Sequence, residues 1–315
     1  MAIKVRDFEV RLTRNKEERK QVRQLRYKIF VEEEGAIPTK EQQNLREEYD
    51  AYDNFAEYMA VFHKNKVVGT YRIIGREAAE KMGGFYTETE FDIKKIKKVR
   101  GNIAEMSRAC VDTNYREGGL VMRMLWMGMT DYILKRKIVL MFGVASWVGT
   151  QPAHYAQAIS YLYYNHLAPI SLRPVVAVEK LDESVNPKLT RMNILPKDFV
   201  DKALAKSQMT PLVKGYLRLG AQFGKGVFID KQFNTSDVFV ILQTKNMNRA
   251  YQKHFTGNEN AFDHLVADDG AMKKFGKVML LPFTGSIALF KAAAQFFLFN
   301  DADDAEIIEE ENNGK

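Results

Sequence analysis

The sequence predicts a single α/β domain over residues 1–245, with a sheet flanked by helices. Apolar runs of strand length alternate with stretches of helical periodicity, and no Pro/Ser-rich linker separates them. Two pairs of apolar runs are joined by short polar turns, KNK in the first pair and NTS in the second, which is typical of paired strands. The remaining residues, 246–315, are predicted to form an appended C-terminal segment.

The helices and strands follow from periodicity in chain order. Residues 16–34 are predicted to be helical because Val22, Leu25, Ile29 and Phe30 fall on one face. Further helices are expected at 120–137, 154–167 and 211–221, and strands at 9–15, 57–63, 67–74, 103–111, 138–147, 173–181, 226–233 and 237–244.

The strand at 103–111 has an unusual composition. Its sequence, IAEMSRACV, places Glu105 and Arg108 inside an apolar run. Residues three apart point to opposite faces of a regular strand. Buried strands rarely hold an acid and an arginine without partners, so this strand is a candidate for functional residues.

Charge is unevenly distributed along the 315 residues. The net charge is +7, and residues 301–315 hold seven acids and one lysine, which leaves +13 on the other 300 residues. A basic body favours an acidic partner, such as a membrane surface, a phosphorylated cofactor or an acidic protein. Basic residues are not interleaved with aromatic ones on a nucleic-acid-binding module, so no nucleic-acid partner is expected.

The cysteine count and the two termini indicate the compartment. Cys110 is the single cysteine, so no internal disulfide is possible, which fits a reducing compartment. The N-terminal residues lack the apolar stretch of a signal peptide. We expect a cytoplasmic protein whose residues 301–315 form a disordered acidic tail.

The C-terminal extension at 246–300 is expected to be helical and contains an apolar segment at 278–299. Lys291 is its single charge, and Pro282 and Gly285 would interrupt a spanning helix. The segment is predicted either to lie on a membrane surface or to pack on the body of the protein. The first alternative predicts a peripheral protein on the inner face of the cytoplasmic membrane.

The turn YREGG at 115–119 precedes the helix at 120–137. Gly118 and Gly119 allow close approach of the backbone to a ligand, and the helix presents unpaired N–H groups. With Arg116, this arrangement predicts a phosphate site, although an ordinary strand–helix turn has the same pattern. No Walker A or G-x-G-x-x-G motif supports nucleotide hydrolysis or dinucleotide binding.

The order of helix, strand pair, E-x-S-R strand, R-x-G-G turn and helix resembles the GCN5-related N-acetyltransferase superfamily. Longer segments resemble the ornithine-lipid acyltransferases of that superfamily. They include LRYKIFVEEEGA, YDAYDNFAEYMAVF, GGFYTETEFDI, FGVASWVGTQPAHYAQAISYLY and PLVKGYLRLGAQFGKGVFIDKQFNTSDVFV. The resemblance implies a mixed central sheet and transfer of a 3-hydroxyacyl chain from acyl carrier protein to the α-amine of ornithine, giving lyso-ornithine lipid.

A more distant resemblance links the chain to acyl-homoserine-lactone synthases. The tryptophan that those synthases place shortly after their phenylalanine is absent here, where the stretch is VEEEGA, which argues against a homoserine-lactone product. The shared pattern appears here as Arg26, Phe30, Asp50, Asp53, Arg72, Glu105 and Arg108.

The resemblance implies roles for these residues. A β-bulge in the E-x-S-R strand would bring Glu105 and Arg108 into one site, or leave Glu105 in the cleft and Arg108 in a supporting salt bridge. Glu105 is then the base that deprotonates the α-ammonium, directly or through one water, and a freed backbone N–H stabilises the oxyanion. No covalent intermediate is required, so Cys110 is interpreted as a small buried residue and not as a nucleophile.

Arg26, Phe30 and Arg72 are predicted to bind substrate with Asp50 and Asp53, whose carboxylates suit the ammonium groups of ornithine. The alternative is a structural ion network. The phosphopantetheine of acyl carrier protein would lie at Arg116, Gly118 and Gly119, as a co-substrate and not as a permanent cofactor.

Several alternatives stay open. The acceptor could be glutamine, glycine or lysine, the enzyme could be an acyl-homoserine-lactone synthase, or the chain could be a non-catalytic carrier- or membrane-binding module. The basic stretch at 91–100 is predicted either to be solvated or to dock acyl carrier protein or an anionic membrane. The five histidines show no metal-ligand spacing, so no metal site is expected.

Overall fold

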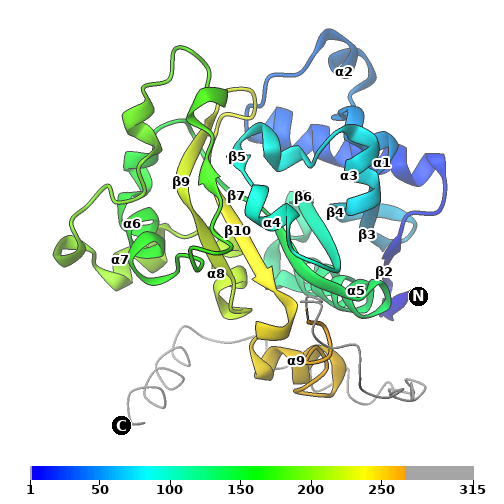
Figure 1. Ribbon diagram of the computed structural model, residues 1–315. Helices are drawn as coiled ribbons and strands as arrows, with labels where there is room; N and C mark the ends of the chain where they lie inside the picture. Colours follow the sequence, from blue (N-terminus) through cyan, green and yellow to red (C-terminus); the bar gives the residue numbers. More distant parts are fainter. Residues whose placement is uncertain (1, 267–315) are drawn as a thin grey trace.

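The structure, a computed structural model, describes residues 2–266 and contains a ten-stranded sheet (Figure 1). The strand order is β1-β2-β3-β4-β6-β7-β10-β9-β8-β5. The strands are β1 (Ile3–Val5), β2 (Phe8–Leu12), β3 (Glu57–His63), β4 (Lys66–Gly75), β5 (Phe91–Asp92), β6 (Asn102–Val111), β7 (Ile138–Val148), β8 (Val175–Val176), β9 (Gln222–Asp230) and β10 (Thr235–Gln243).

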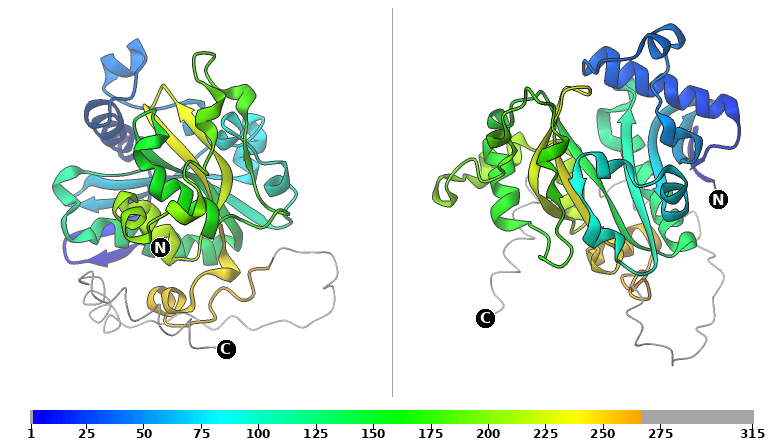
Figure 2. Two further views of the ribbon diagram at one scale, coloured as in Figure 1. Left: turned by 90° about the vertical axis from the view of Figure 1, so that its left-hand side faces the viewer. Right: turned by 45° about the horizontal axis from the view of Figure 1, so that its top comes forward.

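Helices surround this sheet. Figures 1 and 2 show α1 and α2 on one side of the molecule and α6 and α7 on the other. The α-helices are α1 (Lys16–Arg26), α2 (Lys40–Leu45), α3 (Arg76–Met82), α4 (Lys94–Lys97), α5 (Leu120–Arg136), α6 (Ala156–Asn165), α7 (Lys202–Gln208), α8 (Pro211–Arg218) and α9 (Arg249–Thr256). The predicted mixed sheet with flanking helices is confirmed.

The N-terminal helix begins at a cap that the sequence provides. The Asn15 side chain accepts a hydrogen bond from the Glu18 backbone N–H at 2.9 Å, which satisfies one of the unpaired donors of the first turn. Val22 and Leu25 are the buried apolar residues of α1. The predicted helix at 16–34 is confirmed, but its second half, Tyr27–Glu33, is a π-helix. Such widened turns re-aim side chains and are frequent at functional sites.

Helices α1 and α5 cover opposite faces of β3. Tyr58 lies under the Arg19 guanidinium of α1, whereas its neighbour Met59 contacts α5, as strand alternation requires. A Cβ at Gly128 in α5 would lie 2.7 Å from Met59 Sδ and 2.8 Å from Val10 Cγ2. Glycine therefore allows α5 to pack closely against β2 and β3.

Strands β6 and β7 pair in parallel only over their first halves. Their register runs from Asn102 opposite Ile138 to Met106 opposite Gly143, and beyond that point β6 pairs only with β4 and β7 only with β10. The two strands therefore separate in mid-sheet. At the last paired position, a Cβ on Gly143 would lie 2.1 Å from the Met106 carbonyl oxygen, so only glycine fits there.

The predicted strand at 173–181 is wrong in extent. Only Val175–Val176 pair, with β5 and β9, and Val178–Lys180 form a 3₁₀ turn. The neighbouring β5 is only two residues long, and the pairing with β9 is limited to Val175 opposite Lys225, so the rest of the predicted strand does not pair.

The predicted helix at 154–167 is confirmed as a 3₁₀ turn leading into α6. The two strand pairs are confirmed as β3–β4 and β9–β10.

Residues 246–266 pack against the domain. Helix α9 lies below β10 in Figure 1, and Phe262 and Leu265 are buried, with 0% and 2% exposure. The apolar segment at 278–299 and the acidic tail at 301–315 lie outside the described residues. Over residues 2–266, no helix has the length and apolarity needed to cross a bilayer.

The close contact at Gly143 generates a stability prediction. We expect Gly143→Ala to lower the free energy of unfolding by about 2–3 kcal/mol, because the added methyl group must push β6 away from β7. Urea denaturation measures the change. Gly215→Ala is the matched control, because a Cβ there meets open space in α8, and the substitution should be neutral or stabilising. Equal stability of Gly143→Ala and wild type would contradict the packing argument.

Candidate active site

A cavity of about 820 Å³ occupies the space between the separated halves of β6 and β7. Side chains of β6, β7 and β10 form its floor, and α5, α8 and α9 contribute to its walls. Phe30, Arg108, Arg116, Gly118 and Gly119, all predicted site residues, lie on its wall. The described wall does not include Arg26, Asp50, Asp53, Arg72 or Glu105.

One end of the cavity is formed by the predicted phosphate turn. Gly118 and Gly119 have φ values of 67° and 62°, a left-handed conformation that favours glycine. This conformation starts α5, a 17-residue helix without a side-chain N-cap, at the cavity wall. The Arg116 side chain donates hydrogen bonds to the Val111 carbonyl oxygen at 3.0 Å and to the Glu33 carboxylate at 2.9 Å, which hold it in place. The helix start can therefore present N–H donors and positive dipole to an anionic group.

The predicted β-bulge is present in β6. Opposite β4, the register shifts between Ser107 and Cys110, and Arg108 has a φ of 52°. The bulge aims the Arg108 side chain at the cavity, where its guanidinium lies 4.1 Å from the Phe233 ring centroid and 4.5 Å from that of Tyr86. Phe30 packs edge-on against Phe233 at the same wall, with centroids 6.1 Å apart.

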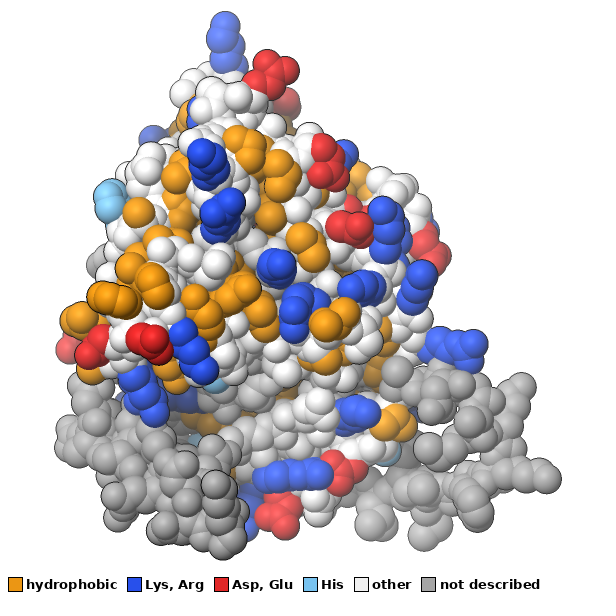
Figure 3. Space-filling model, turned by 60° about the vertical axis from the view of Figure 1, so that its left-hand side comes forward, with side chains coloured by type: hydrophobic (Ala, Val, Ile, Leu, Met, Phe, Trp, Pro, Cys, Tyr) orange, Lys and Arg blue, Asp and Glu red, His pale blue; other side chains and the backbone are white. Residues whose placement is uncertain are grey.

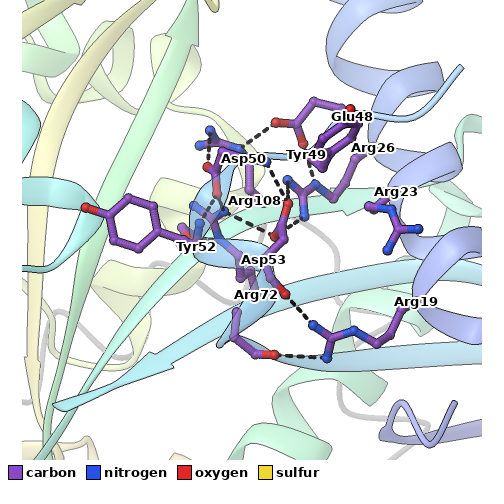
Figure 4. Close-up of polar contacts among 12 residues, drawn as sticks. Arg19, Arg23, Arg26, Glu48, Tyr49, Asp50, Tyr52, Asp53, Arg72 and Arg108 are labelled. Atoms are coloured by element: carbon purple, nitrogen blue, oxygen red, sulfur yellow. Dashed lines mark hydrogen bonds and ion pairs between the residues drawn. The ribbon is translucent and has the colours of Figure 1, made fainter. Parts of the chain in front are cut away.

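Behind this wall lies a network of three arginines and three carboxylates (Figure 4). Arg26 donates to both oxygens of Asp53, at 2.8 and 3.1 Å, and also pairs with Glu48. Arg72 pairs with Asp50 at 2.6 Å and with Asp53 at 3.3 Å. Arg108 also pairs with Glu48 at 3.2 Å and with Asp50 at 3.3 Å. The network thus contains three guanidinium groups and three carboxylates, so its formal charges balance.

The network keeps Asp53 and Glu48 ionised. Burial would raise the pKa of Asp53, yet Arg26 and Arg72 hold that pKa far below its usual range. Burial likewise acts against ionisation of Glu48, but Arg26 and Arg108 lower its pKa. In this structure both Asp53 oxygens are occupied by arginine and backbone donors. The direct substrate contacts expected of Asp50 and Asp53 stay predictions.

Glu105 is fully buried next to this network. Its Oε2 accepts hydrogen bonds from the Thr87 backbone N–H at 3.3 Å and the Thr87 hydroxyl at 3.5 Å. Its Oε1 has no hydrogen-bond partner among the described residues. Burial raises the pKa of Glu105 to about 7, although Arg72 and the Thr87 N–H act in the opposite direction.

A second set of carboxylates, which sequence reasoning missed, lies on the cavity wall. Glu90, Asp230 and Asp237 place oxygens within 4.8 Å of one another, close enough to hold one cation. Asp237 sits inside a buried strand, which is the same signal that singled out Glu105. Asp230 and Glu90 lie at the ends of strands, where a carboxylate in the sequence is ordinary, so only the fold brings the three together.

Cys110 also lines the cavity. Burial raises the pKa of its thiol well above the usual range, so the thiolate needed for nucleophilic attack is disfavoured. This agrees with its interpretation as a small buried strand residue.

The geometry has counterparts in known proteins. Residues 25–127 match the family model of the acetyltransferase (GNAT) domain. An L-ornithine N(alpha)-acyltransferase from Rhodobacter capsulatus is 34% identical over 264 residues, which cover 81% of this chain and 97% of that protein. A protein of the same name from Brucella abortus is 33% identical over 82% of this chain and 92% of its own length.

This chain belongs to the L-ornithine N(alpha)-acyltransferase family. The predicted resemblance is thereby confirmed, and the chain is an acyltransferase with a GNAT-type fold. A solved N-acyl amino acid synthase from uncultured soil microbes has 12% identity and a TM-score of 0.42 over 75% of this chain and 91% of its own. In this member of the acyltransferase family, the matched GNAT region contains the ion network and Glu90, whereas Asp230 and Asp237 lie beyond it.

The ion network generates a prediction for stability. We expect Asp53→Asn to lower the free energy of unfolding at pH 7 by about 3–5 kcal/mol, because it leaves three buried arginines with only two carboxylates and so one uncompensated buried charge. Urea denaturation of Glu77→Gln provides the control, since that exposed carboxylate pairs only with Lys81 on the surface and should change stability by less than about 1 kcal/mol.

The same variant has a signed pH dependence. The folded-state pKa of Asp53 is depressed, so its stabilisation is present above the pKa of the unfolded chain and is lost as pH falls towards the folded value. The stability difference between wild type and Asp53→Asn should therefore narrow as pH falls below about 4. A difference that stays constant down to pH 2 would contradict the assigned ionisation.

Proposed function

We propose that this protein transfers a fatty acyl chain, 3-hydroxylated in the predicted substrate, from acyl carrier protein to the α-amine of L-ornithine. The product is lyso-ornithine lipid. Membership of the L-ornithine N(alpha)-acyltransferase family supports this proposal most directly. The cavity in the split sheet supports it independently, because one space reaches both a helix N-terminus and a set of carboxylates.

The acyl donor would enter at the start of α5. The N–H groups of this helix, with Gly118, Gly119 and Arg116, suit the phosphate of a phosphopantetheine arm. Beyond the turn, the wall becomes apolar, as an acyl chain requires. The apolar wall residues include Met122, Trp126, Leu212, Leu219, Tyr251 and Phe255.

The β6 bulge would stabilise the carbonyl oxygen of the thioester during the reaction. A residue that is extra in the β4–β6 ladder leaves a backbone N–H without its regular ladder partner, and this N–H can stabilise the oxyanion as the amine attacks. Arg108 adds a positive charge at the same wall. The tetrahedral intermediate then collapses, the C–S bond breaks, and the pantetheine sulfur leaves and takes up the second proton that the attacking nitrogen loses.

Glu105 is proposed as the base that takes the proton from the α-ammonium. A pKa of about 7 suits a base at neutral pH. Glu105 lies behind the cavity wall in the described structure, so the proton would reach it through one water. That water would lie at the part of the wall formed by Tyr86 and Ser107. Arg26, Arg72, Asp50 and Asp53 would act on the substrate chiefly by holding Arg108 and the bulge in place.

Surface charge supports the proposed partners. Lys94, Lys95, Lys97, Lys98 and Arg100 are clustered around α4, and an acidic carrier protein would be attracted to them.

A peripheral position on an anionic membrane is supported by a second surface. Figure 3 shows hydrophobic side chains interspersed with lysines and arginines on the side of the molecule that carries α6 and α7. Phe199 and Leu204 are 72% and 55% exposed there, beside the exposed Lys197 and Lys202. Apolar side chains that enter the interface and lysines that contact anionic lipid are the combination such binding requires.

The function is tested by mass spectrometry of products. Purified protein is supplied with a 3-hydroxyacyl carrier protein and a mixture of all protein amino acids plus ornithine. We expect a single acyl-ornithine mass. Another acyl-amino acid, such as acyl-glutamine, acyl-glycine or acyl-lysine, would keep the reaction and replace the acceptor. No acylated product in the presence of lipid vesicles would instead favour a non-catalytic binding module.

The role of Glu105 generates a separate prediction. Glu105→Gln should reduce kcat by at least about 100-fold while the affinity for acyl carrier protein stays unchanged, because the amide cannot accept the proton. Glu179→Gln, on an exposed turn, is the matched control and should retain wild-type turnover. Wild-type kcat in Glu105→Gln would remove Glu105 from the mechanism.

A further inference from the structure

We infer that Glu90, Asp230 and Asp237 bind the side-chain ammonium of the acceptor amino acid and select a cationic acceptor over a neutral one. This inference rests on the proposed function and assigns the acceptor end of its cavity. We call these three residues the carboxylate cluster.

Separate parts of the fold build the carboxylate cluster. Glu90 directly precedes β5, Asp230 ends β9, and Asp237 lies in β10 opposite Ser146 of β7. All three line the cavity, and their carboxylate oxygens approach one another within 4.8 Å. Asp230 is held by the Phe233 backbone N–H, which donates to its Oδ1 at 2.9 Å.

Buried carboxylates are usually paired with a cationic side chain, and the carboxylate cluster has none among the described residues. Glu90 and Asp237 are 2% and 3% exposed. Glu90 Oε2 and Asp237 Oδ1 accept no hydrogen bond from any described residue. Across residues 2–266, no lysine or arginine forms an ion pair with the cluster, although the Arg108 charge acts on it from a distance. Buried carboxylates without a cation are costly even where a neutral hydroxyl, such as that of Ser146 at Asp237, donates a hydrogen bond, so a ligand that supplies both charge and donors would be bound strongly.

The ionisation behaviour agrees with a missing cation. Burial raises the pKa of Asp237 to about 7 and that of Glu90 well above its usual range, and mutual repulsion among the three carboxylates adds to both shifts. An ammonium group among these oxygens would reverse the repulsion and favour the charged forms.

A neighbouring set of carboxylates does not compete for this role. Glu48, Asp50 and Asp53 are balanced by Arg26, Arg72 and Arg108 and lie behind the wall. A ligand ammonium would have to displace an arginine to reach them. The carboxylate cluster is reached from the cavity without such a displacement.

The chemistry indicates which ammonium group the cluster holds. The α-amine must be neutral to attack the thioester, whereas neighbouring carboxylates keep an ammonium protonated. The cluster therefore suits the amine that does not react, at the end of the side chain. Three carboxylates also match the three N–H donors of an ammonium group.

Acceptor discrimination tests the inference in two variants, Asp237→Asn and Glu90→Gln. The acceptors are ornithine and norvaline, which has the same five-carbon chain without the side-chain amine. We expect kcat/KM for ornithine to fall at least 100-fold in both variants, mainly through KM, while kcat/KM for norvaline is unchanged or higher. Asp198→Asn, on an exposed turn, should keep the wild-type preference.

A binding measurement without catalysis separates this inference from the proposed function. Ornithine, but not norvaline, should raise the thermal unfolding temperature of wild type, and both variants should lose this shift. A wild type that shows the shift but transfers no acyl group would contradict the proposed function and leave the acceptor site supported.

Two outcomes would overturn the inference. One is an ornithine preference or an ornithine-induced thermal shift that survives in both variants. The other is stabilisation of wild type by Mg²⁺ or Ca²⁺, lost in both variants and absent with ornithine, which would make the cluster a metal site. Because each substitution replaces a buried carboxyl group that has an unpartnered oxygen, the unliganded variants should be at least as stable as wild type.

Discussion

The balanced network of buried arginines and carboxylates is the interaction on which the rest of the site depends. It joins α1 through Arg26, the loop before β3 through Glu48, Asp50 and Asp53, β4 through Arg72 and the β6 bulge through Arg108. Each group is charged and largely buried, and among the described residues its ion-pair partners are the other members of the network, so the elements that carry them are tied to one another. The bulge and the wall of the cavity are consequently fixed from behind.

The separation of β6 from β7 creates the space that the network frames. Parallel pairing ends at Met106 and Gly143, and β7 continues with β10 while β6 continues with β4. Strands that separate within a sheet expose backbone donors and side chains to a common interior. This arrangement gives an acyl transferase a helix N-terminus, a bulge and an apolar wall around one cavity without interrupting the hydrophobic core on either side.

Carboxylates occur around this cavity in two electrostatic states. In the network, Glu48 and Asp53 are paired with arginines, which lower the pKa of both carboxyl groups and keep them ionised. Those of Glu90, Asp230 and Asp237 face the cavity without a cation, and burial raises the pKa of Glu90 and Asp237. Glu105 lies between these states, buried next to Arg72 with one oxygen unpartnered. Charge balance, more than residue type, therefore distinguishes structural acids from candidate ligand-binding ones.

The sequence by itself determined the elements whose signals are local. The helical period at 120–136, the hairpin at Lys64–Asn65 and the Gly118–Gly119 turn follow from side-chain spacing and backbone freedom within a few residues. The family resemblance lay in longer motifs and supplied the bulge at Arg108. Tertiary structure alone decided that Arg26, Asp53 and Arg72 satisfy one another, and that Glu90, Asp230 and Asp237 meet at one end of the cavity. These residues lie as many as 147 positions apart, and electrostatic partners at such separations leave no periodic trace in the sequence, because the local pattern around a charged residue does not encode its distant partner.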